Sequence, residues 1–385
     1  MAKVLIISGE PSGDLYASGL IKSLKSHNGA VDFFAVGGEN SGSAGAELIA
    51  DIAGLSVMGF TEVVCKLKAI RKILNRVSGW ITANKPDAVI LVDFPSFNFK
   101  IAKLSNRLKI PVIYFIPPKI WASRYKRINF IKRYVKFVIV IFPFELDIYR
   151  NAGIEAYYFG NPLYGLFGKE QKEAETGGIK NYLSGRHPVV SFLPGSRKAE
   201  LKYHADRIAR SLILIKASHK NAFFIFPFRK GIDFSYFLSV IEDKNIPKEW
   251  YAVTDSVRDA LHYCDIAVVA SGTASLEACF YNKPVIIVYY LNYLTYILAK
   301  ILVKVKYIGL INILANDLIV PELIESKFTP ENVYEEIDKF LKDDIYKKSV
   351  LDKISGAVST LKTGDDPFEA SAGIIYDKIL KNIAI

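Results

Sequence analysis

The chain has 385 residues, of which 51% are hydrophobic, and a formal net charge of +11 at pH 7. This length predicts two domains, each large enough for its own core. The three cysteines (Cys65, Cys264 and Cys279) lack metal-ligand spacing, and their odd number argues against a disulfide framework, so a reduced, cytoplasmic protein is expected. Glu10 and Asp14 interrupt the first apolar run, which argues against a secretory signal.

Apolar runs alternate with helical patterns along the first half of the chain. This alternation predicts a parallel sheet with helices on both faces. The expected strands are Lys3–Ser8, Phe33–Val36, Ala88–Val92, Val112–Phe115, Phe137–Ile141 and Tyr157–Phe159.

The first strand ends in a turn of small residues that carries two carboxylates and no cation. A strand, a tight turn and a helix start form a ligand site at the carboxyl end of many α/β sheets. Carboxylates would repel a diphosphate, so the turn is expected to face a neutral hydroxylated group or to supply a base. Asp14 is also expected to cap the next helix. The candidate residues of this acceptor-side loop are Ser8, Gly9, Glu10, Ser12, Gly13 and Asp14.

A basic amphipathic helix is expected over Val63–Val77. Apolar residues recur at three- and four-residue spacing, which places them on one face. Such a helix is typical of proteins that lie on an anionic membrane surface, and the alternative is a core-facing helix with a solvated basic face. No nucleic-acid motif accompanies the charge, so no nucleic-acid partner is expected. The candidate membrane contacts are Leu67, Ile70 and Leu74 with Lys68, Lys72 and Arg76.

Asp93 follows the apolar run Ala88–Val92, at the carboxyl tip of an expected central strand. Catalytic groups often lie at that position. The nearby Phe94 and Phe97 would raise the pKa of the carboxyl group and favour a role as general base. A structural role in the turn is the alternative.

The second half of the chain repeats the same organisation after a polar, charged linker at 165–184. We expect an N-terminal domain at 1–164, a C-terminal domain at 185–355 and a helical segment at 356–385, its last helix capped near Asp366, that packs on the N-terminal domain. The two doubly wound α/β domains are expected to face each other across a cleft. The expected strands are Val189–Leu193, Ala222–Pro227, Tyr251–Val253, Ile266–Ala270 and Val285–Tyr289.

The segment 285–303 is long and apolar enough to be mistaken for a membrane span. It begins directly after Pro284 with β-branched residues, which favours a buried strand followed by a partly exposed apolar helix.

Two loops of the second half are suited to a nucleotide diphosphate. The loop after Val189–Leu193 presents Arg197, whose planar guanidinium group can donate two hydrogen bonds to a diphosphate. The loop after Ile266–Ala270 opens a helix, where backbone N–H groups attract anions, and Glu277 is placed to bind ribose hydroxyls. No acidic pair is placed to hold a metal ion against the diphosphate. The candidate nucleotide residues are Gly195, Ser196, Arg197, Ser271, Gly272, Thr273, Ala274 and Glu277.

Asn312 is a polar residue in an apolar context, and the sequence leaves two roles open for it. It either binds the backbone or reaches a ligand.

Several motifs, in order along residues 4–325, resemble those of the lipid-A-disaccharide synthases. That family is similar in architecture to the two-domain GT-B glycosyltransferases. The motifs are Ser8-Gly9-Glu10-Pro11-Ser12-Gly13-Asp14, Val57-Met58-Gly59, Asp93-Phe94-Pro95-Ser96-Phe97-Asn98, Ile120-Trp121-Ala122, Pro194-Gly195-Ser196-Arg197, Ser271-Gly272-Thr273-Ala274-Ser275-Leu276-Glu277 and Val320-Pro321-Glu322-Leu323.

The resemblance implies an inverting transfer of diacylglucosamine from UDP to the 6-hydroxyl of diacylglucosamine 1-phosphate. It implies catalytic roles for Glu10, Asp93, Arg197 and Asn312, with either carboxylate as the base. It also implies a peripheral enzyme of the inner membrane, because both substrates carry acyl chains. No cofactor is expected, and a homodimer is left open.

This chain departs from the family pattern at Pro117, Ser123 and Ile311, where Ser, an aromatic residue and Pro are usual. These departures affect local loop shape and leave every candidate catalytic position occupied. Two rival functions are another UDP-sugar enzyme with a soluble substrate, such as an epimerase, and an inactive membrane-surface binding protein. The basic amphipathic helix argues against the first rival, and the occupied catalytic positions argue against the second.

Overall fold

The computed structural model describes residues 2–27, 31–51, 62–170, 178–228, 232–290 and 305–381. The chain forms two compact units. Unit 1 comprises Met1–Gly165 together with Leu361–Ile385, and unit 2 comprises Leu166–Thr360. The chain returns to unit 1 after α15 (Asp344–Ser359), so the boundary expected at 355–356 falls inside that helix.

Unit 1 is built on a parallel sheet with the strand order β3-β2-β1-β4-β5-β6-β7. The central strands β4 and β5 are buried along their whole length, as expected for strands that are covered on both faces. The strands are β1 (Ala2–Ile7), β2 (Val31–Gly37), β3 (Glu47–Asp51), β4 (Ala88–Val92), β5 (Val112–Phe115), β6 (Phe137–Val140) and β7 (Ala156–Tyr158).

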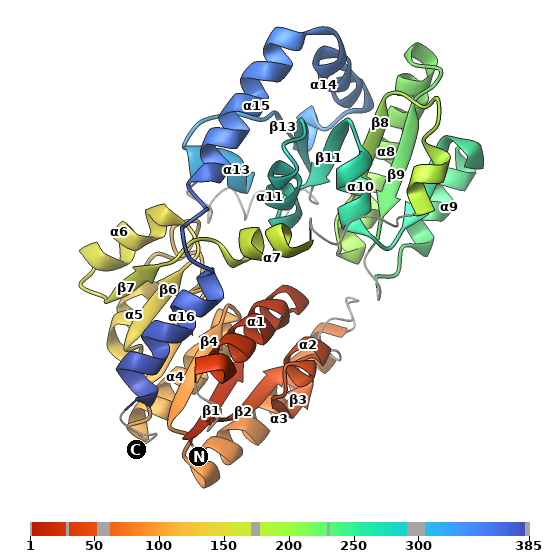
Figure 1. Ribbon diagram of the computed structural model, residues 1–385. Helices are drawn as coiled ribbons and strands as arrows, with labels where there is room; N and C mark the ends of the chain where they lie inside the picture. The colour runs from red at the N-terminus through yellow and green to blue at the C-terminus, as the bar shows by residue number, and fades with distance from the viewer. Residues whose placement is uncertain are drawn as a thin grey trace. The chain divides into compact units, whose positions relative to one another are not determined.

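Helices connect these strands, and the last helix of the chain returns to cover the same sheet. The α16 helix packs against α1, although the two are far apart in the sequence (Figure 1). Its cap is the expected one, because the Asp366 carboxylate accepts a hydrogen bond from the Phe368 N–H at 2.8 Å. The helices are α1 (Pro11–His27), α2 (Glu39–Ser43), α3 (Glu62–Asn84), α4 (Pro95–Arg107), α5 (Arg127–Tyr134), α6 (Pro143–Asn151) and α16 (Pro367–Ile375), which continues into a π-helical turn (Tyr376–Leu380).

Unit 2 repeats the architecture with a parallel sheet in the order β10-β9-β8-β11-β12-β13. The strands are β8 (Val189–Leu193), β9 (Phe223–Pro227), β10 (Tyr251–Thr254), β11 (Ile266–Ala270), β12 (Val285–Tyr289) and β13 (Glu322–Ile324). The helices are α7 (Pro162–Glu170), which begins before the unit boundary, η3 (Gly178–Tyr182), α8 (Lys198–Ser218), α9 (Ser235–Asp243), η4 (Lys248–Trp250), α10 (Val257–Tyr263), α11 (Thr273–Phe280), α13 (Leu310–Ala315), η5 (Glu325–Lys327), α14 (Pro330–Lys342) and α15.

The strand β12 occupies the start of the apolar segment 285–303, as expected. The helix expected after it falls at 291–304, outside the described residues. Within the described ranges, no helix is long and apolar enough to cross a membrane.

Each sheet contains one point where the winding of the chain reverses. In unit 1 this point lies between β1 and β4, and in unit 2 it lies between β8 and β11. Doubly wound α/β sheets bind ligands outside the carboxyl ends of the two strands at such a point. The loops that follow these four strands therefore define where a site is expected in each unit.

Candidate functional site

At the switch point of unit 1, the loop after β1 contacts the loop after β4. Gly9 lies against the ring of Phe94 so closely that a Cβ atom on Gly9 would be 2.1 Å from a ring carbon. Only glycine allows this approach. Glu10 and Asp93, the residues beside this contact, are both exposed. Glu10 is near enough for its charge to raise the pKa of Asp93, so the structure brings together the two carboxylates that the sequence singled out.

The backbone at Asp93 is held in an unusual conformation. Asp93 and Phe94 have φ angles of +44° and +47°, which non-glycine residues adopt rarely and at a cost of about 1 kcal/mol or more each. The Asp93 carbonyl accepts hydrogen bonds from the Tyr114 hydroxyl and the Asn98 amide, both at 2.6 Å. The Asp93 N–H donates to the Ile116 carbonyl at 3.1 Å. These bonds fix the turn in which the carboxylate is presented.

The environment of Asp93 raises the pKa of its carboxyl group. The main cause is desolvation of the carboxyl group by the surrounding protein, and the second is the like charge of Glu10. The Lys119 ammonium and a hydrogen bond from the Phe94 N–H act in the opposite direction. A carboxylate with a raised pKa is a stronger base, so this position is suited to accept a proton from a hydroxyl group.

Asp14 is placed differently from the expectation that it caps its own helix. The side chain is buried within α1 and accepts hydrogen bonds from the start of α2, which it caps instead. The donors are the Gly38 N–H at 2.7 Å, the Asn40 N–H at 3.1 Å, and the N–H and hydroxyl of Ser41. Asp14 therefore joins two loops of unit 1.

The other residues of the loop after β1 are placed as follows. Ser8 is fully buried, and both its N–H and its hydroxyl donate to the Val36 carbonyl. Gly13 is buried, and a Cβ atom there would lie near Ser8 and Val92. Ser12 is half-buried.

In unit 2, the loop after β8 places Arg197 at the start of α8, with its side chain 56% exposed. Glu200 holds this loop in shape. One oxygen of its carboxylate accepts the N–H groups of Ser196 at 3.0 Å and Arg197 at 3.2 Å, and the other contacts the Arg197 guanidinium at 3.1 Å. Gly195 has φ +114° and lies against the Glu200 side chain, so a larger residue would not fit.

His204 also fixes this loop, and sequence reasoning missed it. The buried ring contacts the Pro194 carbonyl through Nδ1 at 2.7 Å, and the Tyr290 N–H contacts Nε2 at 3.1 Å. Burial lowers the pKa of His204, which favours the neutral ring with Nδ1–H as donor. The histidine thus joins the loops after β8 and β12.

The loop after β11 opens helix α11 with Gly272 at the N-cap position. The first turn of a helix carries N–H groups without acceptors in the helix, and these attract anions. Ser275 is buried, and its hydroxyl donates to the Gly272 carbonyl at 2.7 Å. Thr273 is exposed, whereas Ala274 and Glu277 are half-buried. Because β8 and β11 are neighbours, this loop and Arg197 lie at one edge of the same sheet.

Asn312 is fully buried and uses its side-chain amide within the protein. The amide donates to the Val320 carbonyl and the Glu322 carboxylate, both at 2.9 Å. Its oxygen accepts the N–H groups of Ile319 and Val320. Of the two roles that the sequence left open, the geometry therefore favours backbone binding.

Glu322 extends this network toward the nucleotide loop. Its carboxylate accepts the N–H groups of Ile308 and Gly309, and the Ile308 carbonyl accepts the hydroxyl of Ser271 at 3.2 Å. Asn312 can therefore act on the loop after β11 through Glu322.

The structure contradicts part of the membrane-binding face that the sequence predicts for α3. Ile70 and Leu74 are half-buried and pack against the core of unit 1, so they are turned toward protein rather than lipid. The side chain of Leu67 lies outside the described residues. Lys68, Lys72 and Arg76 are exposed, as the amphipathic pattern predicts.

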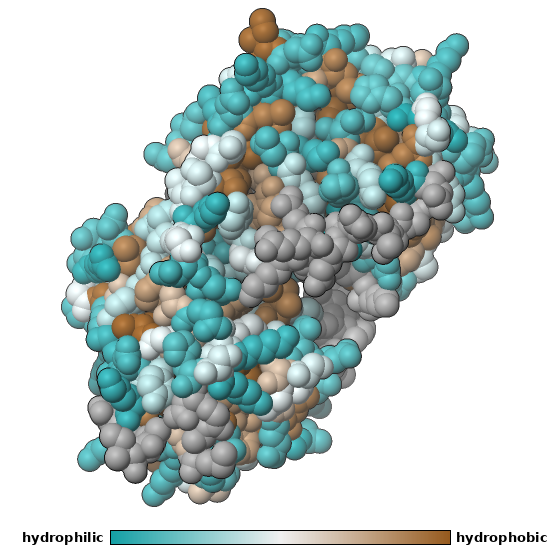
Figure 2. Space-filling model, viewed as in Figure 1, coloured by the Kyte–Doolittle hydropathy of each residue, from teal (hydrophilic) through white to brown (hydrophobic). Residues whose placement is uncertain are grey.

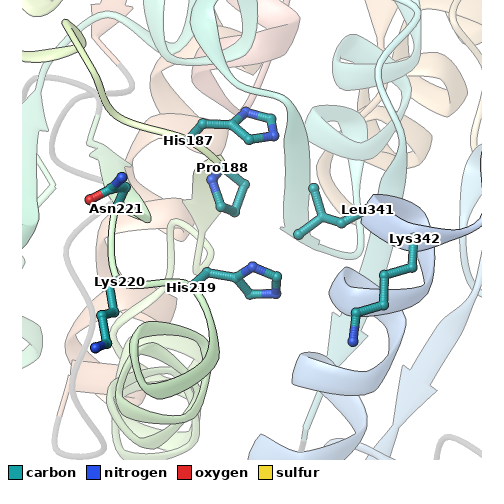
Figure 3. A pocket seen from close by; sticks show the side chains of 7 residues that line it. All are labelled: His187, Pro188, His219, Lys220, Asn221, Leu341 and Lys342. Carbon is teal, nitrogen blue, oxygen red and sulfur yellow. The ribbon is translucent and has the colours of Figure 1, made fainter.

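One pocket of about 360 Å³ lies at the opposite end of the sheet of unit 2 (Figure 3). It is lined by residues that precede β8 and β9, among them His187 and His219, and by Leu341 and Lys342 at the end of α14. The Asp338 carboxylate pairs with His219 at 3.1 Å and with Lys342 at 2.7 Å. Ligands of doubly wound sheets bind at the carboxyl edge, so this pocket is not the candidate nucleotide site.

The fold is similar to that of solved structures of an epimerase and a transferase. An epimerase from Neisseria meningitidis bound to UDP-GlcNAc aligns with a TM-score of 0.65 and 13% identity, over 99% of this chain and 100% of that one. A UGT transferase from Siraitia grosvenorii in complex with UDP aligns with a TM-score of 0.61 and 14% identity, over 99% and 100%. The chain is thus a two-domain α/β protein of the GT-B architecture.

Sequence comparisons give the family. The model of the lipid-A-disaccharide synthetase family matches residues 4–360. Lipid-A-disaccharide synthase 1 of Legionella pneumophila is 33% identical over 94% of both chains, and the lipid-A-disaccharide synthase of Geobacter metallireducens is 31% identical over 98% of both. This chain belongs to the lipid-A-disaccharide synthase family.

Proposed function

We propose that this chain is an inverting glycosyltransferase of lipid A biosynthesis. It transfers 2,3-diacylglucosamine from UDP to the 6-hydroxyl of 2,3-diacylglucosamine 1-phosphate, which gives a β-1,6-linked disaccharide 1-phosphate and UDP. The observation that carries this proposal is the family match over residues 4–360. The geometry of the two switch points supports the assignment of roles to individual residues.

The proposed reaction is a single displacement. Asp93 accepts the proton of the acceptor hydroxyl, whose oxygen forms a bond to the anomeric carbon as the bond from that carbon to the UDP oxygen breaks. Glu10 is the second choice for the base. Arg197 and the N–H groups at the start of α11 stabilise the negative charge that develops on the leaving diphosphate. Glu277 binds the ribose hydroxyls, and Asn312 has a positioning role through Glu322.

The direct test is an assay with the purified protein, UDP-diacylglucosamine and diacylglucosamine 1-phosphate, in which UDP and disaccharide are both measured. Equal amounts of the two products are expected, and only when the acceptor is present. Activity is expected to persist in EDTA, because Arg197 and helix N–H groups supply the positive charge. Conversion of the donor without acceptor and without UDP release would favour the rival epimerase-type function, and no turnover would favour a binding protein.

We also propose that a basic surface of unit 1 rests on an anionic membrane, where both acylated substrates are found. The α4 helix packs beside α3 and α5, and these helices carry exposed cations. The sequence has no acidic residue between Asp93 and Glu145. On the face of the molecule shown in Figure 2, hydrophobic residues occur in separate areas among hydrophilic ones. The exposed cations of these helices are Lys68, Arg71, Lys72, Arg76, Lys100, Lys103, Arg107, Lys132 and Arg133.

Replacement of Lys68, Lys72 and Arg76 by Gln is expected to weaken binding to anionic vesicles roughly 100-fold at low salt, because each cation near such a surface contributes about 1 kcal/mol. Wild-type protein should sediment with anionic vesicles and be partly released at high salt. The matched control replaces Lys220, Lys248 and Lys348, three exposed lysines of unit 2, and should bind as wild type does. Equal binding by both triple variants would assign the contact to another surface.

A further inference from the structure

Lys119 lies on a loop of unit 1 whose backbone is anchored on both sides. Before it, the Ile116 N–H donates to the Ile139 carbonyl at 2.9 Å, and the Pro118 carbonyl accepts the hydroxyl of the buried Tyr149 at 3.2 Å. After it, Ile120 is only 1% exposed. Two consecutive prolines precede Lys119 and restrict the backbone further. The exposed side chain of Lys119 therefore extends into solvent from a backbone position that is fixed.

A buried carboxylate completes this anchoring. Trp121 donates from its indole N–H to Glu145 at 2.8 Å, and the N–H groups of Ile141 and Phe142 donate to the other oxygen of Glu145. Burial raises the pKa of Glu145 to about 7 in spite of these three donors. The loop that carries Lys119 is thus tied to the start of α6, next to the end of β6.

This loop is bonded to the turn that carries the candidate base, and the charge of Lys119 acts on Asp93. The Asp93 N–H donates to the carbonyl of Ile116, which directly precedes the two prolines. Of the two charged side chains that shift the pKa of Asp93, Glu10 raises it and Lys119 lowers it. An anion that approaches Asp93 therefore meets two carboxylates and one ammonium group.

We propose that Lys119 binds the phosphate group of the acceptor sugar and selects phosphorylated over neutral acceptors. This inference rests on the proposed function, in which the hydroxyl deprotonated by Asp93 and the 1-phosphate belong to the same sugar ring. A phosphate monoester carries a charge of about −1.5 to −2 at pH 7 and would be repelled by Glu10 and Asp93. The Lys119 ammonium offsets this repulsion and is long and flexible enough to reach across one ring.

The test compares diacylglucosamine 1-phosphate with the same sugar lacking phosphate, for wild type and for Lys119→Gln. Wild type is expected to prefer the phosphorylated acceptor by roughly 10- to 100-fold in kcat/KM, the range of a charge-assisted hydrogen bond. Lys119→Gln should lose this preference through a higher KM for the phosphorylated acceptor, with the KM for the UDP-sugar unchanged. Lys119→Arg should restore most of the preference. Lys22→Gln removes an exposed lysine of α1 in the same unit and should behave as wild type.

A second measurement distinguishes phosphate binding from a structural role of the loop. Loss of the Lys119 charge is expected to move the acid limb of the pH–rate profile with the neutral acceptor to higher pH, since this ammonium lowers the pKa of Asp93. The inference would be overturned if Lys119→Gln kept the preference for the phosphorylated acceptor, or if it raised the KM for the UDP-sugar instead. The glycosyltransferase assignment would stand in both cases. Wild type that turns over neither acceptor would instead overturn the proposed function.

Discussion

Asp93→Asn is expected to lower turnover by roughly 100- to 10,000-fold, the usual contribution of a general base, with UDP affinity nearly unchanged. Asn is the informative replacement because it tolerates the φ of +44° at this position better than Ala, so the turn is preserved. The matched control is Asp87→Asn at the other end of β4, where the carboxylate accepts the Lys3 N–H at 2.8 Å. Turnover is measured by UDP release, and affinity by calorimetry.

The pH dependence provides an independent check of the same assignment. A base must be deprotonated, so activity is expected above the pKa of Asp93 and is lost as the pH falls through it. Glu10→Gln removes a like charge that raises this pKa, and should therefore move the acid limb to lower pH. Near-normal turnover in Asp93→Asn would remove Asp93 from the mechanism and make Glu10 the preferred base.

Arg197→Ala is expected to weaken UDP binding by roughly 10- to 100-fold, because a hydrogen bond to a charged group contributes about 1.5–3 kcal/mol. Arg197→Lys should recover only part of the affinity, because lysine keeps the positive charge but lacks the planar guanidinium group that donates two hydrogen bonds at once. The control is Arg210→Ala on the same helix, where the guanidinium is 59% exposed and pairs with Asp206 at 3.1 Å. Calorimetric titration with UDP measures the effect.

A thermal melt separates this loss of affinity from a loss of folding. A cation at the start of a helix is unfavourable for the helix dipole, and the Arg197 side chain is 56% exposed where it contacts Glu200, so Arg197→Ala should melt close to wild type. If the variant melts normally and binds UDP as wild type does, the nucleotide site lies elsewhere.

The central strands were predictable because their signal is local. Ala88–Val92, Val112–Phe115, Val189–Leu193, Ile266–Ala270 and Val285–Tyr289 are continuous apolar runs, and the structure confirms each with the same ends. Two edge strands were missed. β3 begins and ends in the acidic residues Glu47 and Asp51, and β13 has three residues, so neither contains an apolar run of more than three residues.

The residues that hold the nucleotide loops were harder to find, because most of their partners are distant in the sequence. His204 joins Pro194 to Tyr290, and Ser271 is tied to Ile308 and through it to Glu322. Glu200 is the exception. It follows Arg197 by three residues, the spacing of a helix capping box, and this signal could have identified it.

The amino-acid sequence by itself determined the two parallel α/β units, the loops rich in small residues and the family resemblance, since each depends on residues that are near one another in the chain. Only the tertiary structure decided the strand order, which makes β4 the neighbour of β1 and β11 the neighbour of β8. It also decided that Ile70 and Leu74 face the core and that Asp14 caps α2. The physical reason is the same in each case: these features depend on which segments meet in space, and the periodicity of one segment carries no information about its partner.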